Sequence, residues 1–447
     1  MVSDGVLHES VSWLLALVSG EIPSASADEK FAPRLAEGRN IGAVIAKRFA
    51  GFRDAAPTIV TFDRTGDAAA AVVVRSGDEL WEFAIGVEPA EPYRIRSFRP
   101  RPVPADAPEW TDLVDQLRRL DHAVSELPGS LAEQVHQHLA AVVAEDRIPG
   151  LSCGIAVDGE VVHREYLGTG DVRTLTRLDA GAVFRVGSVT KLVTALAVLD
   201  LVREGRLDLD APLGPEAGFD ATVGDVLLHR AGLPKDLTLR RDTAALPQSL
   251  ADALALLPPA RPSSASGRPE YSNLGYELLG LLVEQVTGAP FAEHCAGRVL
   301  ARYGLAGAHF SGPGTPAPST VVGSEAIAGR IAPVAEAAEP YRFAGGMTAD
   351  LDSVLTLAGV VGRAGDPLAE ALLAHTAPAG PGASFIPGAT LLDRADGPIL
   401  WRGGSTRGFT AELMAAVDGS AAVVLLGASS TAAGLRQTAE GLLRVVG

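Results

Sequence analysis

The 447-residue chain has little cysteine and no long apolar run. Its two cysteines, Cys153 and Cys295, stand far apart in the sequence. Their spacing suggests neither a disulfide framework nor a metal site, and both fit reduced thiols in a core. No apolar stretch approaches the length of a membrane-spanning helix. The sequence also contains no glycine-rich nucleotide loop and no zinc signature, so we expect neither a cofactor nor a metal.

Acidic residues outnumber basic ones, and the formal net charge is −16. This charge argues against a nucleic-acid partner and against binding to an anionic membrane surface. Ahead of the short apolar run at residues 11–18, the chain carries Asp4, His8 and Glu9 but neither lysine nor arginine. Because a secretory signal needs a basic start, we expect this stretch to be a folded amphipathic helix and the protein to be cytoplasmic.

Residues 6–98 show the pattern of a small α+β domain. Helices are expected near 6–19, 28–37 and 40–52, followed by strands at 58–62, 68–75, 79–87 and 93–98. Helices followed by an antiparallel meander resemble the cone-shaped fold of nuclear-transport-factor-2 (NTF2) and ketosteroid-isomerase proteins. That fold can hold a small-molecule pocket, so isomerase or cyclase chemistry is one alternative, and a structural role, including formation of a homodimer, is the other.

Four prolines between residues 100 and 108 predict a stiff linker. We therefore expect two domains, 1–108 and 109–447, and 47% hydrophobic residues are enough to fill both cores.

The strongest chemical signal is a Ser-x-x-Lys pair, Ser188 and Lys191, at the start of an apolar helix that Gly205 ends. Residues three apart share a helix face, so the hydroxyl and the amine project to one side, at the positive end of the helix dipole. A neutral amine can take the serine proton, and exposed backbone N–H groups can stabilise an oxyanion. The alternative is a helix-capping serine followed by an ordinary solvated lysine.

Lysine is scarce enough in this chain to be informative. Only four of the 38 basic residues are lysine, and the abundance of Ala, Arg and Gly suggests a high-GC, actinobacterial source. Arginine cannot release its proton, whereas a buried lysine can. A lysine at position 191 therefore indicates proton chemistry.

The remaining chain predicts one antiparallel sheet interrupted by a helical region. A helical segment is expected at 109–127, helices at 130–145 and 432–446, and strands at 151–157, 160–167, 399–401, 409–417 and 420–428. The region between, about 188–380, is mostly helical. We therefore expect an α+β fold in which a five-stranded antiparallel sheet carries the terminal helices on one face and an inserted helical subdomain.

Five motifs, in order along the chain, resemble those of serine β-lactamases and penicillin-binding-protein-type hydrolases. They are the Ser188 segment at 184–191, VGDVLLHRAGLP at 223–234, Tyr-Ser-Asn at 271–273, FAGGMTAD at 343–350 and WRGGSTRGF at 401–409. Each motif is weak alone, but the ordered set is specific. The resemblance runs from about residue 130 to the end and is best to the class C β-lactamase, esterase and D-aminopeptidase branch. It implies a serine hydrolase or acyltransferase that forms an acyl-enzyme with an ester, an amide or a β-lactam.

The resemblance also implies roles for the first two boxes. Ser188 is the nucleophile, Lys191 and Tyr271 remove its proton, and Asn273 orients the substrate. A loop before a helix can aim a tyrosine hydroxyl and an asparagine amide into one cleft, where the tyrosine can serve as general base. The alternatives are a core aromatic at 271 and a helix cap at 273.

The third box departs from the family, because Arg402 stands where lysine or histidine is usual. Arginine keeps the positive charge but cannot shuttle protons, and it suits a substrate carboxylate. We therefore expect a small-molecule acyl substrate with an anionic group, unless Arg402 is only a solvated residue on an edge strand. Gly403 and Gly404 allow a substrate to lie along this strand. The resemblance implies that the N–H of Ser405 joins that of Ser188 as the oxyanion hole.

Weaker candidates are polar residues elsewhere. His229 is expected to be a structural, hydrogen-bonded histidine. Lys235 and Asp236 are expected to lie in a solvated loop, and the alternative is that they line the mouth of the cleft. His136 and His138, two apart on a helix, face different directions and make a poor metal pair.

Two hypotheses besides an active hydrolase stay open. The second domain could have lost turnover and act as a binding or sensor module, or the chemistry could reside in the first domain. An isomerase-like domain ahead of a β-lactamase-like one is similar to the architecture of a protein of clavulanic acid biosynthesis. This similarity suggests a role in secondary metabolism.

Overall fold

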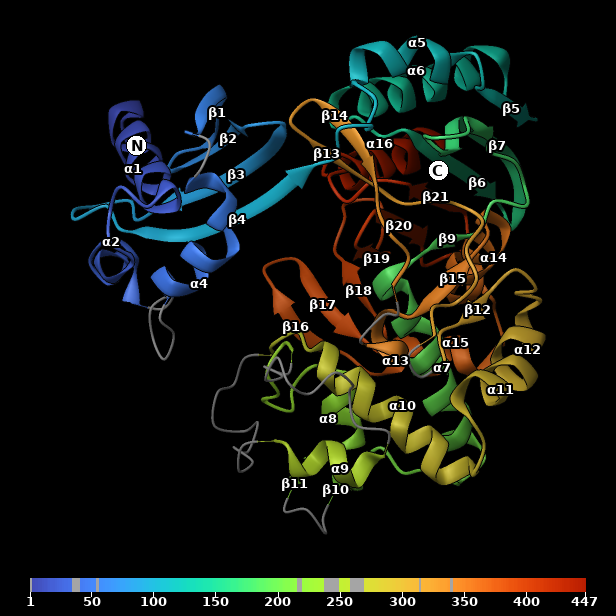
Figure 1. Ribbon diagram of the computed structural model, residues 1–447. Coiled ribbons are helices and arrows are strands. Elements are labelled where there is room, and N and C mark those ends of the chain that lie inside the picture. Colours follow the sequence, from blue (N-terminus) through green and yellow to red (C-terminus); the bar gives the residue numbers. More distant parts are fainter. Residues whose placement is uncertain are drawn as a thin grey trace. The chain divides into compact units, whose positions relative to one another are not determined.

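The structure is a computed structural model that describes residues 2–33, 41–53, 56–214, 219–236, 249–257, 269–312, 315–337 and 341–447. The chain divides into two compact units, of which the first contains residues 1–110 and 326–332 and the second contains 111–325 and 333–447 (Figure 1). Among the described residues, no helix combines the length and the hydrophobicity that a membrane span requires.

The first unit packs short helices on a four-stranded antiparallel meander. Its helices are α1 (Asp4–Ser19), α2 (Ala27–Lys30) and α4 (Ile41–Arg48), and its strands, in sheet order, are β1 (Thr58–Gly66), β2 (Ala69–Ser76), β3 (Glu79–Val87) and β4 (Ile95–Val103). Helix α1 begins where the Ser3 hydroxyl accepts the N–H of Val6 and ends at Gly20 in the left-handed conformation. Its apolar face, including Leu7 and Leu14, joins strand residues in one buried cluster.

Two predictions for the first unit need correction. Pro100 and Pro102 were assigned to a linker but lie inside β4. Because β4 is an edge strand, a residue without an N–H is tolerated there. The helix expected at 28–37 is interrupted at Phe31, which is extended and bridges to Ile95, while residues 34–40 lie outside the described part. The NTF2-like cone stays a prediction.

Residues 326–332 are distant in sequence from the rest of the first unit, but they complete a small hydrophobic cluster in it. Ile327 and Ala332 pack with Val103 and Ala107 in this cluster. Nearby, the N–H of Ala328 donates to a carboxylate oxygen of Glu82 at 2.9 Å. The border predicted between residues 108 and 109 stays a prediction.

The second unit is built on a ten-stranded antiparallel sheet. The strand order is β16-β17-β18-β19-β20-β21-β6-β7-β5, with β8 beside β7. These strands are β16 (Ala377–Gly380), β17 (Ala383–Ile386), β18 (Ala389–Leu392), β19 (Ile399–Thr406), β20 (Phe409–Ala416), β21 (Ala421–Gly427), β6 (Gly150–Val157), β7 (Glu160–Asp171), β5 (His122–Ser125) and β8 (Thr176–Arg177).

The five predicted strands form the centre of this sheet, but five strands were too few. Strands β16, β17 and β18 extend the sheet beyond β19, and β5 and β8 extend it at the other edge. Strand β5 also replaces the end of the helix expected at 109–127, because α5 (Trp110–Arg118) stops earlier. These extra strands have two to four residues, too few for an alternating pattern to be recognised.

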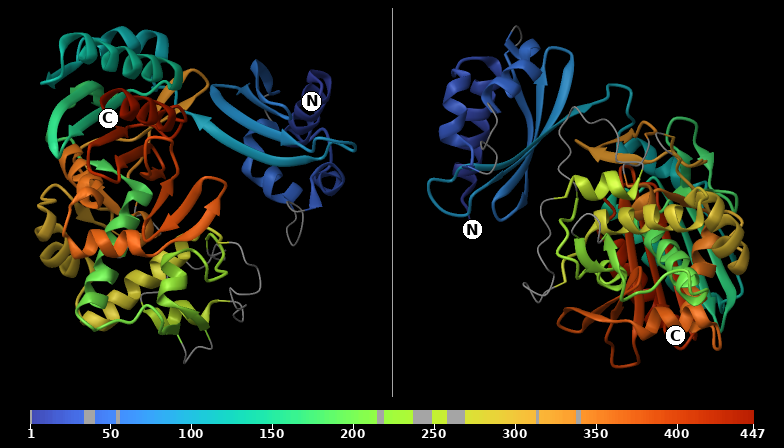
Figure 2. Two further views of the ribbon diagram at one scale, coloured as in Figure 1. Left: turned by 180° about the vertical axis from the view of Figure 1, so that it is seen from behind. Right: turned by 90° about the horizontal axis from the view of Figure 1, so that it is seen from below.

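Helices cover both faces of the sheet (Figure 2). The terminal helices α6 (Gly129–Asp146) and α16 (Leu435–Val446) share one buried cluster with the strands, as predicted. The other face packs on α14 (Leu351–Ala358) and continues into the helical region. That region contains α7 (Thr190–Arg203), α8 (Val223–Leu227), α9 (Leu250–Ala255), α10 (Asn273–Thr287), α11 (Phe291–Cys295), α12 (Ala301–Tyr303), α13 (Arg342–Gly345) and α15 (Pro367–Ala374).

Short strands and turns join these helices to the sheet. They are the 3₁₀ turn η3 (Gly187–Val189) and the strands β9 (Phe184–Arg185), β10 (Pro212–Gly214), β11 (Phe219–Thr222), β12 (His309–Phe310) and β15 (Met347–Ala349). Strands β13 (Ser324–Ile327) and β14 (Arg330–Pro333) pair with each other, and most of their residues belong to the first unit. Helix α7 is buried on all sides from Thr190 to Leu201, so Lys191 in its first turn is inside the protein.

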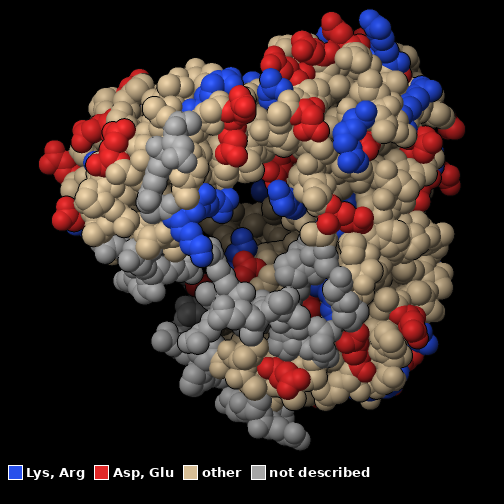
Figure 3. Space-filling view, viewed as in Figure 1, with Lys and Arg blue, Asp and Glu red and all other residues tan. Residues whose placement is uncertain are grey.

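Charged groups of both signs share the surface shown in Figure 3. Over the described residues of this face, Asp and Glu side chains are interspersed with Lys and Arg side chains among uncharged residues. The described residues also include exposed ion pairs, such as Arg164 with Asp352 at 2.7 Å. Such pairs stabilise the fold only weakly, so burial of α7 and the sheet core is the larger contribution.

Candidate active site

The Ser188 hydroxyl is half-buried at the turn that leads into α7. Gly187 has a φ of +51°, a conformation that favours glycine, and a Cβ there would lie 2.8 Å from the backbone nitrogen of Ser405. The Thr190 hydroxyl donates to the carbonyl of Gly187 at 2.6 Å and accepts the N–H of Met347 at 3.1 Å. The turn that carries the serine is therefore held by β15 and lies against β19.

Lys191 is fully buried, and three acceptors from the described residues lie around its amine. They are Ser188 Oγ at 3.0 Å, Asn273 Oδ1 at 2.8 Å and the Ala344 carbonyl at 2.7 Å. The amide oxygen of Asn273 and the carbonyl oxygen of Ala344 can only accept, so they take two N–H groups of the amine. At its third position the amine either donates to Ser188 or accepts the serine proton. Reversal of this one hydrogen bond is the proton transfer that activates a nucleophile.

Tyr271 brings a phenol to the same serine. Its hydroxyl lies 2.8 Å from Ser188 Oγ and accepts a hydrogen bond from Arg402 Nη2 at 2.5 Å. The Lys191 amine and the Arg402 guanidinium lie 5.0 and 5.2 Å from the centre of its ring. The phenol oxygen accepts from Arg402 with one lone pair, which leaves its own proton or a second lone pair directed at Ser188. Tyr271 can therefore exchange a proton with Ser188.

Arg402 is buried, with 5% of its surface exposed, and its guanidinium binds groups of the protein itself. Besides the phenol, its Nε donates to the backbone carbonyl of Ser188 at 2.9 Å. Arg402 therefore ties β19 to both the nucleophile turn and Tyr271, which excludes the alternative of a solvated arginine. Its predicted contact with a substrate carboxylate stays a prediction.

The backbone of β19 lies directly against the nucleophile turn. A Cβ at Gly404 would lie 2.0 Å from the Val186 carbonyl and 3.1 Å from the backbone nitrogen of Ser188. The backbone nitrogen of Ser405 approaches the same turn at Gly187. The two N–H groups predicted to form an oxyanion hole are thus brought together, and glycine is required at 404 for this approach.

The loop before α10 fixes Asn273 from the other side. The N–H of Asn273 donates to the Lys235 carbonyl at 2.8 Å, and its side-chain amide donates to a carboxylate oxygen of Asp236 at 2.8 Å. Asp236 is exposed, as expected for a residue of a solvated loop, and it also orients the amide that holds Lys191. Sequence reasoning missed this role, since nothing local to Asp236 reveals its partner.

His229 is a buried structural histidine, as predicted. Its Nδ1 accepts the N–H of Ser272 at 3.2 Å, and its ring packs 4.7 Å from that of Tyr271. Burial, with smaller contributions from the charges of Arg402 and Lys191, holds the pKa of His229 well below its usual range. The neutral imidazole ring therefore packs against the ring of Tyr271 and helps to hold it in position.

The remaining histidine candidates have separate partners. His136 Nδ1 lies 2.6 Å from a carboxylate oxygen of Glu165, whereas His138 Nδ1 lies 2.8 Å from the Gln134 carbonyl. Within the described ranges, no group of three or more His, Cys, Asp or Glu residues is arranged to hold a metal ion.

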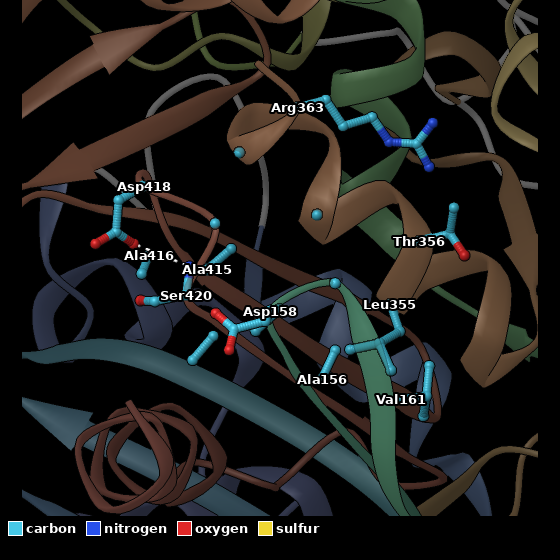
Figure 4. Close-up of a pocket in the computed structure, with 16 residues that line it drawn as sticks. Ala156, Asp158, Val161, Leu355, Thr356, Arg363, Ala415, Ala416, Asp418 and Ser420 are labelled. Carbon is cyan, nitrogen blue, oxygen red and sulfur yellow. Dashed lines mark hydrogen bonds between the residues drawn. The ribbon is translucent and has the colours of Figure 1, made fainter.

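A cavity of about 440 Å³ lies away from Ser188, at the hairpin-turn end of the sheet (Figure 4). It is lined by small residues and by Asp158, Asp418 and Ser420. Figure 4 shows Arg363 extending away from these carboxylates, and its guanidinium lies 5.2 Å from the ring of Tyr303. The described residues that line this cavity include no lysine, histidine or tyrosine, so it lacks the amine and the phenol that lie beside Ser188.

Comparison with known proteins gives a family match over most of the second unit. A family model described as Beta-lactamase matches residues 135–447. Protein flp of Staphylococcus aureus (strain NCTC 8325 / PS 47) is 26% identical over 37% of this chain and 36% of its own length. Penicillin-binding protein 4 of Amycolatopsis lactamdurans is 32% identical over 37% of this chain and 45% of its own. The chain thus matches less than half the length of these curated relatives.

Solved structures match the fold over a longer range. SurE aligns with a TM-score of 0.61 at 24% identity, covering 71% of this chain and 76% of its own. EstCE1, described as a hydrolase with promiscuous acyltransferase activity, aligns with a TM-score of 0.60 at 20% identity over 71% and 98% of the two chains. The D-amino acid amidase of Ochrobactrum anthropi SV3 aligns with a TM-score of 0.60 at 21% identity over 71% and 99%. At these identities, the likeness shows the fold.

Proposed function

Because the chain belongs to the beta-lactamase family, we propose that it is a serine hydrolase or acyltransferase that forms an acyl-enzyme on Ser188. The observation that carries the proposal is the convergence of three heteroatoms. The Lys191 amine lies 3.0 Å and the Tyr271 hydroxyl 2.8 Å from Ser188 Oγ. An amine and a phenol at this distance are within reach to remove the serine proton.

Acylation follows from this geometry. As Ser188 Oγ attacks the substrate carbonyl, its proton passes to Lys191 or Tyr271, and the carbonyl oxygen becomes an oxyanion. The N–H groups of Ser188 and Ser405 stabilise that charge, and Tyr271 then delivers a proton to the leaving group. The bond to the leaving group breaks, and the acyl group remains on Ser188.

Deacylation uses the same groups in reverse. Tyr271 takes a proton from water or from another acceptor, which attacks the acyl-enzyme and frees Ser188. Asn273 lies between Lys191 and Asp236, where it can orient a substrate amide or ester without exchanging a proton. Arg402 cannot replace the proton carrier of other members, so proton transfer rests on Lys191 and Tyr271.

The substrate class is an ester, an amide or a β-lactam. The structural neighbours described as a hydrolase with acyltransferase activity and as a D-amino acid amidase support acyl transfer at a carbonyl. We keep the expectation of a substrate with an anionic group, placed by the positive charge of Arg402. A role in secondary metabolism belongs to the same proposal.

A labelling experiment tests the proposal directly. The full chain is exposed to a fluorophosphonate, and peptide mass spectrometry locates the adduct. We expect the adduct on Ser188 and none in the Ser188→Ala variant, and absence of labelling in the folded wild type would contradict the proposal. A panel of p-nitrophenyl esters, nitrocefin and D-amino acid amides then identifies the acyl group. Activity that persists in the Ser188→Ala variant would indicate that the reaction takes place in the first unit.

A further inference from the structure

Helix α10 presents three residues of one face to α13 and to the amine of Lys191. Asn273, Glu277 and Gly280 are spaced by four and three residues, so they lie along one side of the helix. Asn273 binds the Lys191 amine directly at 2.8 Å. Glu277 Oε2 accepts the N–H of Phe343 at 3.0 Å, and a Cβ at Gly280 would lie 2.1 Å from the Phe343 ring. The helix therefore holds the amine directly and also holds α13.

Helix α13 supplies the second acceptor of the buried amine. The Ala344 carbonyl accepts from Lys191 at 2.7 Å. The preceding residue, Phe343, is fixed on both sides, because its N–H donates to Glu277 and its carbonyl accepts the Thr194 hydroxyl at 2.7 Å. The Glu277 carboxyl therefore sets the position of the residue that places the Ala344 carbonyl against the amine.

Glu277 is itself a buried acid, with 2% of its surface exposed. Within the described part of the chain, its Oε1 has no hydrogen-bond partner, and the nearest cation, Arg342 Nε, lies 3.7 Å away. Burial raises the pKa of Glu277 to about 7, although the N–H of Phe343 and the charges of Arg342 and Lys191 oppose the shift. The charged groups around it are Glu284 on its own helix, Arg342 on α13 and Lys191 on α7.

We propose that Glu277 is a positioning residue whose ionisation controls the proton-accepting strength of Lys191. The inference rests on the proposed function, since it concerns the base of that reaction. An ionised carboxylate binds the Phe343 N–H more strongly than a neutral acid does and so fixes α13. Its negative charge also stabilises the ammonium that forms as Lys191 takes the serine proton. Acylation is therefore faster when Glu277 is ionised.

The test compares the pH dependence of Ser188 labelling in three full-length proteins. Wild type, Glu277→Gln and Glu284→Gln are labelled with a fluorophosphonate from about pH 5.5 to about pH 9. In the Glu277→Gln variant, the side-chain amide keeps an oxygen for the Phe343 N–H but cannot ionise. Glu284 is a matched control, because it lies two turns further on the same face and an amide can still accept the N–H of Phe291.

We expect the wild-type rate to rise with pH through an inflection near neutrality. Glu277→Gln should remove that inflection and lower the rate at alkaline pH about tenfold, because a neutral acceptor replaces a charged one. Glu284→Gln should keep the inflection but move it to lower pH, because the charge of Glu284 contributes to the raised pKa of Glu277. Melting temperatures show whether the variants are folded, and a purely structural role would change them without changing the shape of the profile.

A Glu277→Gln profile with the wild-type shape overturns the inference. If this variant does not fold, the wild-type profile decides, and a rate that stays flat across neutral pH also overturns it. Arg342→Gln offers a further test, because loss of the facing cation should move the inflection to higher pH. Wild type that is not labelled at Ser188 would instead contradict the proposed function.

Discussion

Gly404 is the position at which added volume should damage the proposed oxyanion site most. A Cβ there would lie 2.0 Å from the Val186 carbonyl and 3.1 Å from the backbone nitrogen of Ser188. Both atoms belong to the backbone of the nucleophile turn, which Arg402 and β15 hold in place. We therefore expect Gly404→Ala to push β19 away from Ser188.

The size of the effect follows from that displacement. Relief of a 2.0 Å approach requires a shift on the order of 1 Å, and misplacement by this amount costs about 100-fold in rate. Loss of one oxyanion donor costs about 100- to 1000-fold in kcat. We therefore expect Gly404→Ala to lower kcat for ester hydrolysis, and the rate constant of fluorophosphonate labelling, by roughly 100- to 1000-fold.

Gly403→Ala is the matched control, one residue earlier on the same strand. A Cβ there would lie 3.2 Å from its nearest atoms, which are the side-chain ends of Glu412 and Trp401. Side-chain ends can move by a few tenths of an ångström, so this variant should keep its rate within a few-fold. Equal rates for folded Gly404→Ala and Gly403→Ala proteins, with circular dichroism spectra like that of wild type, would refute the reasoning.

Three further predictions concern proton transfer and pH. Tyr271→Phe removes a proposed general base and should lower the labelling rate by about 10²- to 10⁴-fold in a variant that circular dichroism shows to be folded; a loss below tenfold would argue against that role. In Arg402→Lys, one cationic nitrogen replaces the two guanidinium nitrogens that now bind Ser188 and Tyr271. We expect kcat to fall roughly tenfold or more, because one of these two hydrogen bonds is lost. An unchanged kcat would show that positive charge alone is sufficient at this position. The hydrogen bond to Glu165 raises the pKa of His136, so its stabilising contribution is full below about pH 6.5 and is lost as pH rises through the folded-state pKa. The difference in melting temperature between wild type and His136→Asn should therefore be largest at acidic pH, and a constant difference would contradict the assignment.

The sequence predicted the family and the central residues of the site because both are encoded locally. Spacing alone places Ser188 and Lys191 on one helix face, and ordered motifs identify Tyr271 and Asn273. The family model confirms the predicted resemblance over residues 135–447, and the α+β fold is confirmed as well. The catalytic roles, the NTF2-like domain and the cytoplasmic location stay predictions.

Other features could not be predicted because they depend on partners distant in sequence. The Ala344 carbonyl binds Lys191 through a backbone atom, which every residue possesses, so its identity gives no signal. Glu277 and Asp236 act through contacts with residues that are distant in the sequence. The residues next to them in the sequence do not indicate those contacts. The sheet was expected to have five strands because the edge strands are too short to alternate.

The position of residues 326–332 in the chain affects how the first unit folds during synthesis and where the gene can be truncated. They complete the cluster of Val103 and Ala107, yet the ribosome adds them more than two hundred residues after that pair. This small cluster can therefore form only when most of the second unit has been synthesised. A single cut of the gene at any point between residues 111 and 325 leaves the amino-terminal fragment with apolar side chains uncovered, so expression of that fragment alone should yield a poorly soluble product.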